Sequence, residues 1–190
     1  MRIKASLDEM LKHIGTPKVY EFVDGFGPFG VVAQQRGLKV DSDEEQRYKT
    51  FLLRIINSIP QNPSRLYDNI DMVLRTFTIS HVQLDRLLHE LIYNAICHGN
   101  QFAKELKIAV KIFDGPTGYI VSIEDQGQGF DIKEVLSKGL YERGGVGMLD
   151  LQNSPFYWDF QGSQLNLLNV HNPAKKIWLG LSYLGRKLTG

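Results

Sequence analysis

Three polar side chains occur at four-residue intervals in residues 90–100, which read ELIYNAICHGN. They are the carboxylate of Glu90, the amide of Asn94 and the imidazole of His98. In a helix, positions i, i+4 and i+8 lie on one face. An amphipathic helix that buries its leucines on another face has no packing reason to align three polar groups. The spacing therefore favours a binding or catalytic face.

The chemistry of these three groups suits a metal-bound nucleotide. Mg²⁺ prefers oxygen ligands and commonly takes only one or two from protein, the rest coming from phosphates and water. Asn94 offers an amide oxygen without adding negative charge beside a triphosphate. Glu90 could accept a proton from an attacking hydroxyl or water as a general base. His98 taken alone is equally typical of a polar residue at a helix end.

A second motif, EDQGQGFD, covers residues 124–131 and follows an apolar strand. Asp125, at the end of that strand, could accept a hydrogen bond from an exocyclic amine such as adenine N6. Gly127 and Gly129 would let the backbone approach a ligand closely. Taken alone, this string is often only a turn. Its position after the helix that carries Glu90, Asn94 and His98, and after a predicted β-hairpin, favours a pocket for a nucleotide base.

A third motif, GGVGM, covers residues 144–148 and contains Gly145 and Gly147 just before a predicted short helix. Backbone N–H groups at a helix start, together with the helix dipole, attract anions, so this segment could hold phosphate. The alternative is a flexible hinge. Lys138 and Arg143 precede it and could reach phosphates, although solvated loop charges explain them as well.

Gly25, Gly27 and Gly30 also have the spacing of a dinucleotide-binding fingerprint. That motif needs a helix directly after the glycines. Pro28 lies inside the turn and VVAQQ follows it, which we expect to form a strand, so we reject this reading. The cysteine–histidine spacing does not resemble a zinc site.

The elements that would position these motifs follow from periodicity and turn residues. The patterns favour helices over 6–14, from Asn62 to about Phe77, from Ser80 to Gly99 (closed by Gly99 in a left-handed conformation) and near Gly145. They favour strands over 18–23, 31–34, 48–59 (where a helix is also compatible), 107–114, 119–125, 157–161, 164–170 and 177–183. We therefore expect an α+β two-layer sandwich, with a mixed, mainly antiparallel sheet covered on one face by helices. The polar stretch 41–46 suggests a boundary between an appendage, residues 1–47, and a main domain, residues 48–190.

Composition limits the classes of function. The chain has 190 residues, 43% of them hydrophobic and 23% charged, which is typical of a soluble globular protein. A net charge of +1 gives no global field that would recruit nucleic acid or an anionic membrane. Cys97 is the single cysteine, and neither a signal peptide nor a membrane-spanning run is recognisable. We expect a cytoplasmic protein.

The three motifs, in this order, resemble the N, G1 and G2 boxes of the Bergerat-fold (GHKL) ATPases, the superfamily of gyrases, sensor histidine kinases and mismatch-repair ATPases. The likeness covers about residues 48–185 and is closest to the anti-sigma factor serine/threonine kinases, in which the box ends in His-Gly-Asn. It implies ATP and Mg²⁺ as cofactors. It also implies a homodimer that phosphorylates a STAS-like anti-sigma antagonist and sequesters a sigma factor.

Carried over by position, the resemblance implies a role for each of the motif residues. Glu90 would be the catalytic base, Asn94 the magnesium ligand and Asp125 the adenine contact, with His98 closing the first box. The pocket for the base would be shaped by Gly127 and Gly129, and phosphate would be held by Gly145 and Gly147.

The sequence also departs from the family pattern. Pro155 follows the third motif within about two turns and so shortens the helix expected there. NPAKKIWLGL stands where the family often places a Gly-Thr pair near the base, so either nucleotide affinity is weak or Ser182 or a water replaces that contact. Two alternatives stay open: a non-catalytic, ATP-dependent binding switch, and the separate ATP-binding domain of a histidine kinase.

Overall fold

The structure is a computed structural model that describes residues 7–59, 82–116, 118–129, 157–161, 164–172 and 177–180. Helices and strands both contribute to it, so the expected α+β class is confirmed. The helical elements are α1 (Leu7–Ile14), α2 (Gly30–Gln35), α3 (Ser42–Ser58), α5 (Val82–Asn94) and the π-helical turn η2 (Ala95–Gly99). The strands are β1 (Lys18–Asp24), β2 (Ile108–Gly115), β3 (Gly118–Asp125), β4 (Tyr157–Gln161), β5 (Gln164–Asn172) and β6 (Ile177–Gly180).

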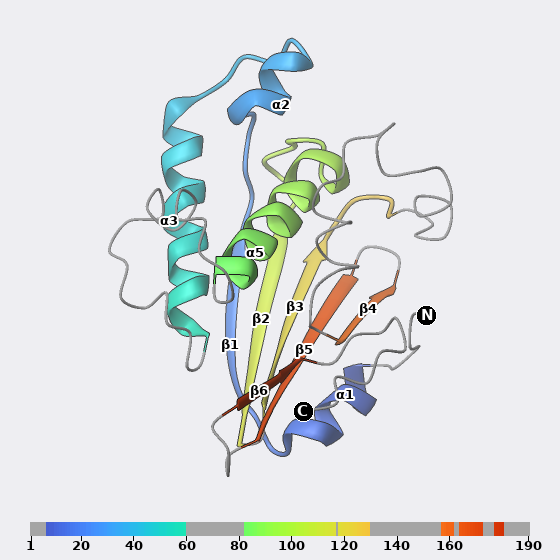
Figure 1. Ribbon diagram of the computed structural model, residues 1–190. Helices are drawn as coiled ribbons and strands as arrows, with labels where there is room; N and C mark the ends of the chain where they lie inside the picture. The colour runs from blue at the N-terminus through green and yellow to red at the C-terminus, as the bar shows by residue number, and fades with distance from the viewer. Residues whose placement is uncertain are drawn as a thin grey trace.

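One six-stranded sheet organises the chain, in the order β1-β2-β3-β5-β4, with β6 pairing to β5 (Figure 1). Every pairing among the described strands is antiparallel, so the parallel pairing of the expected mixed sheet does not occur in this part of the chain. The predicted hairpin is confirmed, with Ile108 opposite Asp125 at its open end and Gly115 opposite Gly118 at its turn.

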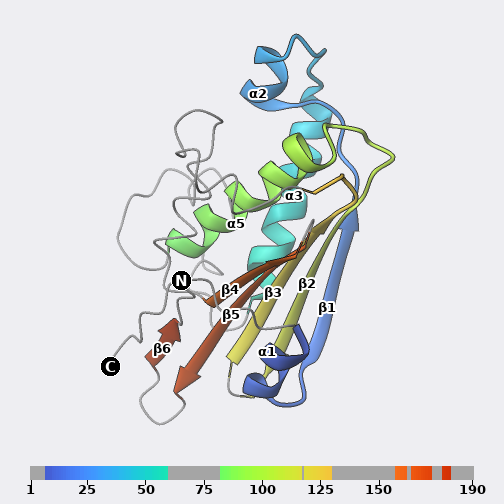
Figure 2. The ribbon, with the colours of Figure 1, turned by 90° about the vertical axis from the view of Figure 1, so that its right-hand side faces the viewer.

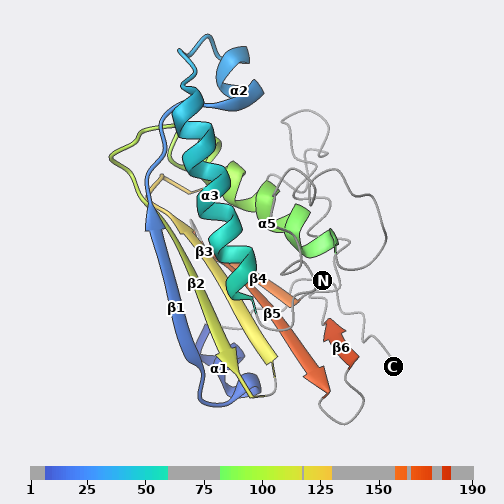
Figure 3. The same cartoon turned by 90° about the vertical axis from the view of Figure 1, so that its left-hand side faces the viewer.

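Helices α3 and α5 cover one face of the sheet, whereas α1 lies on the opposite face near the β2–β3 turn (Figures 2 and 3). The expected arrangement had helices on one face only. Helix α1 is held there because its side chains Met10 and Ile14 are fully buried. The core between the sheet and the two larger helices is rich in aromatic rings, which include Phe22, Phe26, Phe29, Tyr48, Phe51 and Phe102.

Residues 48–59, expected as a strand, form most of helix α3. The Asp41 side chain caps this helix by accepting a hydrogen bond from the Asp43 backbone N–H at 2.9 Å, and three acidic residues occupy its first turn. Tyr48, Leu52 and Ile55 are buried at helical spacing. The boundary expected at residue 47 therefore falls inside a helix. The described residues before it supply β1 to the sheet and side chains to the same core.

Residues 31–34, also expected as a strand, lie in the short helix α2. One of the two grounds for rejecting the dinucleotide-binding fingerprint, the strand expected after the glycines, is therefore wrong, because a helix follows them. A different reason excludes a dinucleotide fold at this place. Strand β1 pairs antiparallel to β2, whereas that fold requires parallel strands joined by a helix.

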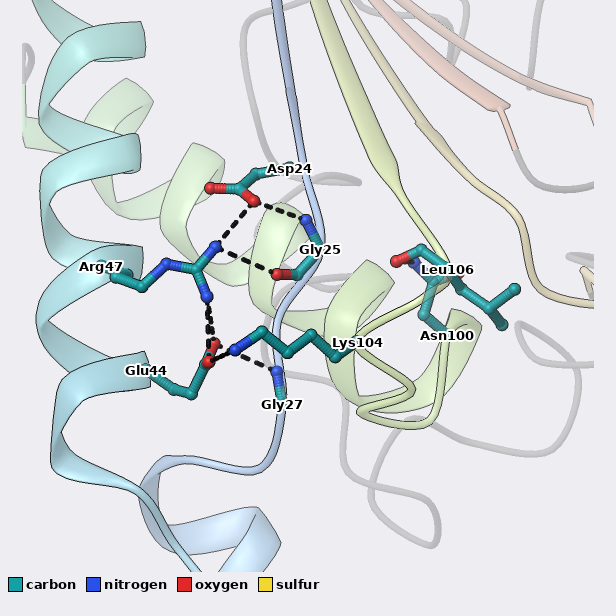
Figure 4. Close-up of polar contacts among 8 residues, drawn as sticks. All are labelled: Asp24, Gly25, Gly27, Glu44, Arg47, Asn100, Lys104 and Leu106. Atoms are coloured by element: carbon teal, nitrogen blue, oxygen red, sulfur yellow. Dashed lines mark hydrogen bonds and ion pairs between the residues drawn. The ribbon is translucent and has the colours of Figure 1, made fainter.

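The glycine turn between β1 and α2 is occupied by a carboxylate of the chain itself (Figure 4). Glu44 is 4% exposed and accepts a hydrogen bond from the Gly27 N–H at 3.2 Å. Arg47 lies 2.9 Å from the same carboxylate, and Lys104 also pairs with it. Burial raises the pKa of Glu44, but the bond from Lys104, the Gly27 N–H and the charge of Arg47 outweigh it, so the pKa is lowered. This network joins α3 to the turn and to the loop before β2.

Candidate functional site

Helix α5 positions the first motif through its apolar face. Leu87, Leu88, Leu91 and Ile92 are buried, as the sequence pattern predicts. Glu90 and Asn94 are partly buried. The helix therefore holds a carboxylate and an amide one turn apart, at the edge of the packed layer and within reach of solvent. Partial burial leaves both groups accessible to a ligand, which is one condition of the roles expected for them.

The helix changes geometry directly after Asn94. Residues Ala95–Gly99 form the π-helical turn η2, in which the Asn100 N–H donates to the carbonyl of Ala95 at 2.8 Å. A π turn needs one more residue than an α turn to return to the same face. His98 is therefore displaced from the line of Glu90 and Asn94, in contrast to the straight stripe expected from the spacing. Its Nδ1 atom lies 3.0 Å from Nη2 of Arg36.

The end of this helix lies directly against the second motif. A Cβ atom placed on Gly99 would lie 2.5 Å from the Asp125 carboxyl carbon, and one placed on Gly127 would collide with the Gly99 carbonyl. The Gly127 N–H donates to Asp125 Oδ1 at 2.9 Å. The structure thus brings the Asn94 helix together with Asp125 and Gly127. These residues come from separate motifs of the sequence.

Gly99 does not adopt the left-handed conformation expected of it. At this end of the helix the residues in the left-handed region are Gln101 and Phe102, with φ of 53° and 60°. Gly99 is required for a different reason, because only a residue without a side chain allows the Asp125 carboxylate to lie this close. Gly129 has a φ of 70°. Outside the described residues lie Gly145, Gly147, Lys138, Arg143, Pro155, Ser182 and the expected helices over 62–77 and near Gly145.

Asn100 is a site residue that the sequence pattern did not single out. The residue is 3% exposed, and its side chain makes three hydrogen bonds. Nδ2 donates to the carbonyls of Leu106 and Lys107, each at 3.1 Å, and Oδ1 accepts from the Gln126 N–H at 3.0 Å. Asn100 therefore fastens the end of η2 both to the loop before β2 and to the loop after Asp125. The sequence feature that could have identified Asn100 is its place at the end of the His-Gly-Asn string.

Replacing Asn100 with alanine is expected to lower the free energy of unfolding by about 2 kcal/mol, because three backbone groups lose their partner. The measurement is urea denaturation at constant m value. Asn57→Ala, at an exposed position of α3, is the matched control and should change stability by less than about 0.5 kcal/mol. Equal stability of the two variants would contradict the role of Asn100.

The Asp125 carboxylate is partly desolvated. Burial raises its pKa, the Gly127 N–H acts in the opposite direction, and the neighbouring charge of Glu124 raises the pKa further. The net pKa lies above its ordinary value. The folded state thus holds the ionised form at a cost relative to the unfolded chain. A hydrogen-bond donor on a bound ligand would relieve that cost, as the amino group of adenine would.

Replacing Asp125 with asparagine is expected to leave stability unchanged or raise it at neutral pH, because the uncompensated charge is removed. Since the folded-state pKa is raised, the difference from the wild type should shrink as the pH falls through that pKa. If Asp125 has the role of adenine contact that the resemblance implies, the same variant binds ATP about tenfold more weakly than the wild type. Thermal unfolding and calorimetry measure the two effects. Glu124→Gln removes an adjacent exposed charge and should retain ATP affinity.

No cluster of three or more His, Cys, Asp and Glu side chains suited to a metal occurs among the described residues. A magnesium ion held by the Asn94 amide oxygen would draw its remaining ligands from phosphates and water. A surface hollow between α3 and the end of β1 involves a different part of the chain and contains none of the predicted site residues. It is lined by Asp24, Asp43, Gln46, Arg47, Thr50, Phe51 and Arg54.

Comparison with known proteins does not place the chain in a family. No family model matches it, and no curated protein matches it either. Among the helices that the structure describes, none has the length and apolar character needed to cross a membrane.

Proposed function

We propose that this protein is an ATP- and Mg²⁺-dependent serine/threonine kinase of the anti-sigma factor type, built on a Bergerat ATP-binding fold. The observation that carries the proposal is the close contact of Gly99 with Asp125 and Gly127. It joins the helix that carries Glu90 and Asn94 to the strand end that carries the base-binding aspartate. The antiparallel sheet with two helices on one face is compatible with that fold.

In this proposal each residue has one role. Asp125 accepts a hydrogen bond from adenine N6, Gly127 and Gly129 shape the base pocket, and Gly145 and Gly147 hold phosphate. Asn94 holds Mg²⁺, which supplies charge neutralisation at the phosphates when it is bound. In-line phosphoryl transfer depends mainly on such positioning and neutralisation.

Glu90 acts on the protein substrate. It accepts the proton of a serine hydroxyl whose oxygen forms a bond to the γ-phosphorus, while the bond from that phosphorus to the oxygen of the departing ADP breaks. The substrate is an anti-sigma antagonist with a STAS-like domain, and the kinase is a cytoplasmic homodimer that also sequesters a sigma factor. His98 closes the motif at the helix end.

Calorimetry of ATP binding to the folded wild-type chain, with and without Mg²⁺, tests the nucleotide site. We expect binding that is stronger with Mg²⁺, and no binding in either condition would refute the proposal. A phosphate-transfer assay against isolated antagonist domains tests the kinase step. Nucleotide binding without transfer would favour the non-catalytic switch, in which ATP alters the affinity for a partner.

A further inference from the structure

Arg36 links the amino-terminal part of the chain to the candidate site. It caps the carboxyl end of α2, yet its guanidinium reaches η2, far along the sequence. Nη1 donates to the carbonyl of Cys97 at 2.6 Å, and Nη2 lies 3.0 Å from Nδ1 of His98. The guanidinium carbon also lies 5.9 Å from the centre of the Phe102 ring. One side chain therefore touches three residues at the end of the helix.

The segment that Arg36 contacts has an unfavourable backbone. A π turn is rare, and two consecutive left-handed residues follow it, of which Phe102 is bulky. Such conformations persist only where the surroundings hold them in place. The last carbonyls of a helix also lack hydrogen-bond partners within the helix. The Arg36 guanidinium supplies such a partner for the carbonyl of Cys97. Phe102 is 4% exposed, so its burial anchors the other side of the segment.

The contact with His98 fixes the state of its ring. An arginine guanidinium only donates hydrogen bonds, so Nδ1 of His98 must be an acceptor. The imidazole is then neutral and carries its proton on Nε2. Burial lowers the pKa of His98, and the positive charge of Arg36 lowers it further, which favours the same neutral form.

We propose that Arg36 is a positioning residue of the candidate nucleotide site. It holds η2 and the left-handed pair in the conformation that places Gly99 and Asn100 against the Asp125 loop, and it holds His98 as a neutral donor through Nε2. The term nucleotide site rests on the proposed function, whereas the positioning itself rests only on the contacts of Arg36. The segment before residue 47, expected as an appendage, thereby completes the site.

The test compares the full-length wild type with Arg36→Met, Arg36→Lys and the matched control Arg54→Met. Arg54 is an exposed arginine that stacks on the buried Phe22 ring, at 5.6 Å from its centre. Nitrogen-15 NMR of His98 reports its tautomer and pKa, and amide hydrogen exchange reports the protection of Asn100, Phe102 and Gln126. Calorimetry reports ATP affinity.

In the wild type we expect one His98 tautomer, protonated on Nε2. Arg36→Met should raise the pKa of His98, mix its tautomers and speed exchange of the Asn100, Phe102 and Gln126 amides about tenfold. Its ATP affinity should fall about tenfold. Arg36→Lys retains the charge but cannot contact the Cys97 carbonyl and His98 at the same time. Exchange of the three amides should therefore quicken while the pKa of His98 stays low. Arg54→Met should match the wild type in His98 spectra and in these amides.

Unchanged His98 spectra and unchanged exchange in Arg36→Met would overturn the proposal, as would faster exchange spread evenly over the chain. If Arg36→Met does not fold, the same criteria apply to exchange and ATP affinity in Arg36→Lys. A wild type that binds no ATP would refute the proposed function alone, because the NMR and exchange measurements decide the role of Arg36 without nucleotide.

Discussion

Replacing Gly127 with alanine is expected to lower the free energy of unfolding by about 3 kcal/mol, the upper end of the range for overpacked sites. The added methyl group would collide with the backbone carbonyl of Gly99, which cannot rotate away as a side chain end could. The helix end and the Asp125 loop must then separate. ATP binding should be lost together with the stability, and denaturation and calorimetry measure the two effects.

Gly27→Ala is the matched control. A Cβ atom at Gly27 would meet the Glu44 side chain at 3.6 Å, an ordinary van der Waals distance. Its N–H bond to Glu44 would be retained, so we expect a change below about 1 kcal/mol and no change in ATP affinity. If Gly127→Ala were as stable as Gly27→Ala, the close packing of the two motifs would be incorrect.

Replacing Asn94 with alanine is expected to weaken ATP binding in the presence of Mg²⁺ about 100-fold, because the metal loses its amide oxygen. The affinity measured without Mg²⁺ should change little. Glu90→Ala should bind ATP with Mg²⁺ as the wild type does but lose phosphate transfer. Calorimetry with and without Mg²⁺, followed by the transfer assay, separates the two roles.

Asn57→Ala on the exposed surface of α3 controls for the removal of an asparagine from a helix, and it should bind ATP normally. Equal ATP affinities for the wild type, Asn94→Ala and Glu90→Ala in the presence of Mg²⁺ would refute the assignment of Asn94. A Glu90→Ala variant that still transfers phosphate would remove Glu90 as the base and leave the nucleotide site intact.

Local sequence patterns sufficed to predict the β2–β3 hairpin and helix α5. Strand β2 alternates buried with partly buried residues, whereas β3 is an almost continuous buried run, and the predicted ends of both strands agree with the structure within one residue. Helix α5 was likewise predicted from its leucine face. The strands predicted over 48–59 and 31–34 were wrong, because short apolar runs fit either a strand or a helix. For 48–59, the polar stretch 41–46 suggested a domain boundary, whereas its Asp41 cap and acidic residues mark the start of helix α3.

The sequence by itself determined which chemical groups this protein offers: a carboxylate and an amide one turn apart on α5, and an aspartate with two glycines after β3. Only the tertiary structure decided how these groups meet. The contact of Gly99 with Asp125 and the bonds from Asn100 to Gln126 and from Arg36 to Cys97 join residues distant in sequence. The π turn that displaces His98 is local, and Arg36 contacts it from the end of another helix. Local spacing fixes the order of side chains along one element. Contacts between elements depend on packing and on the pairing of buried polar groups across the whole chain.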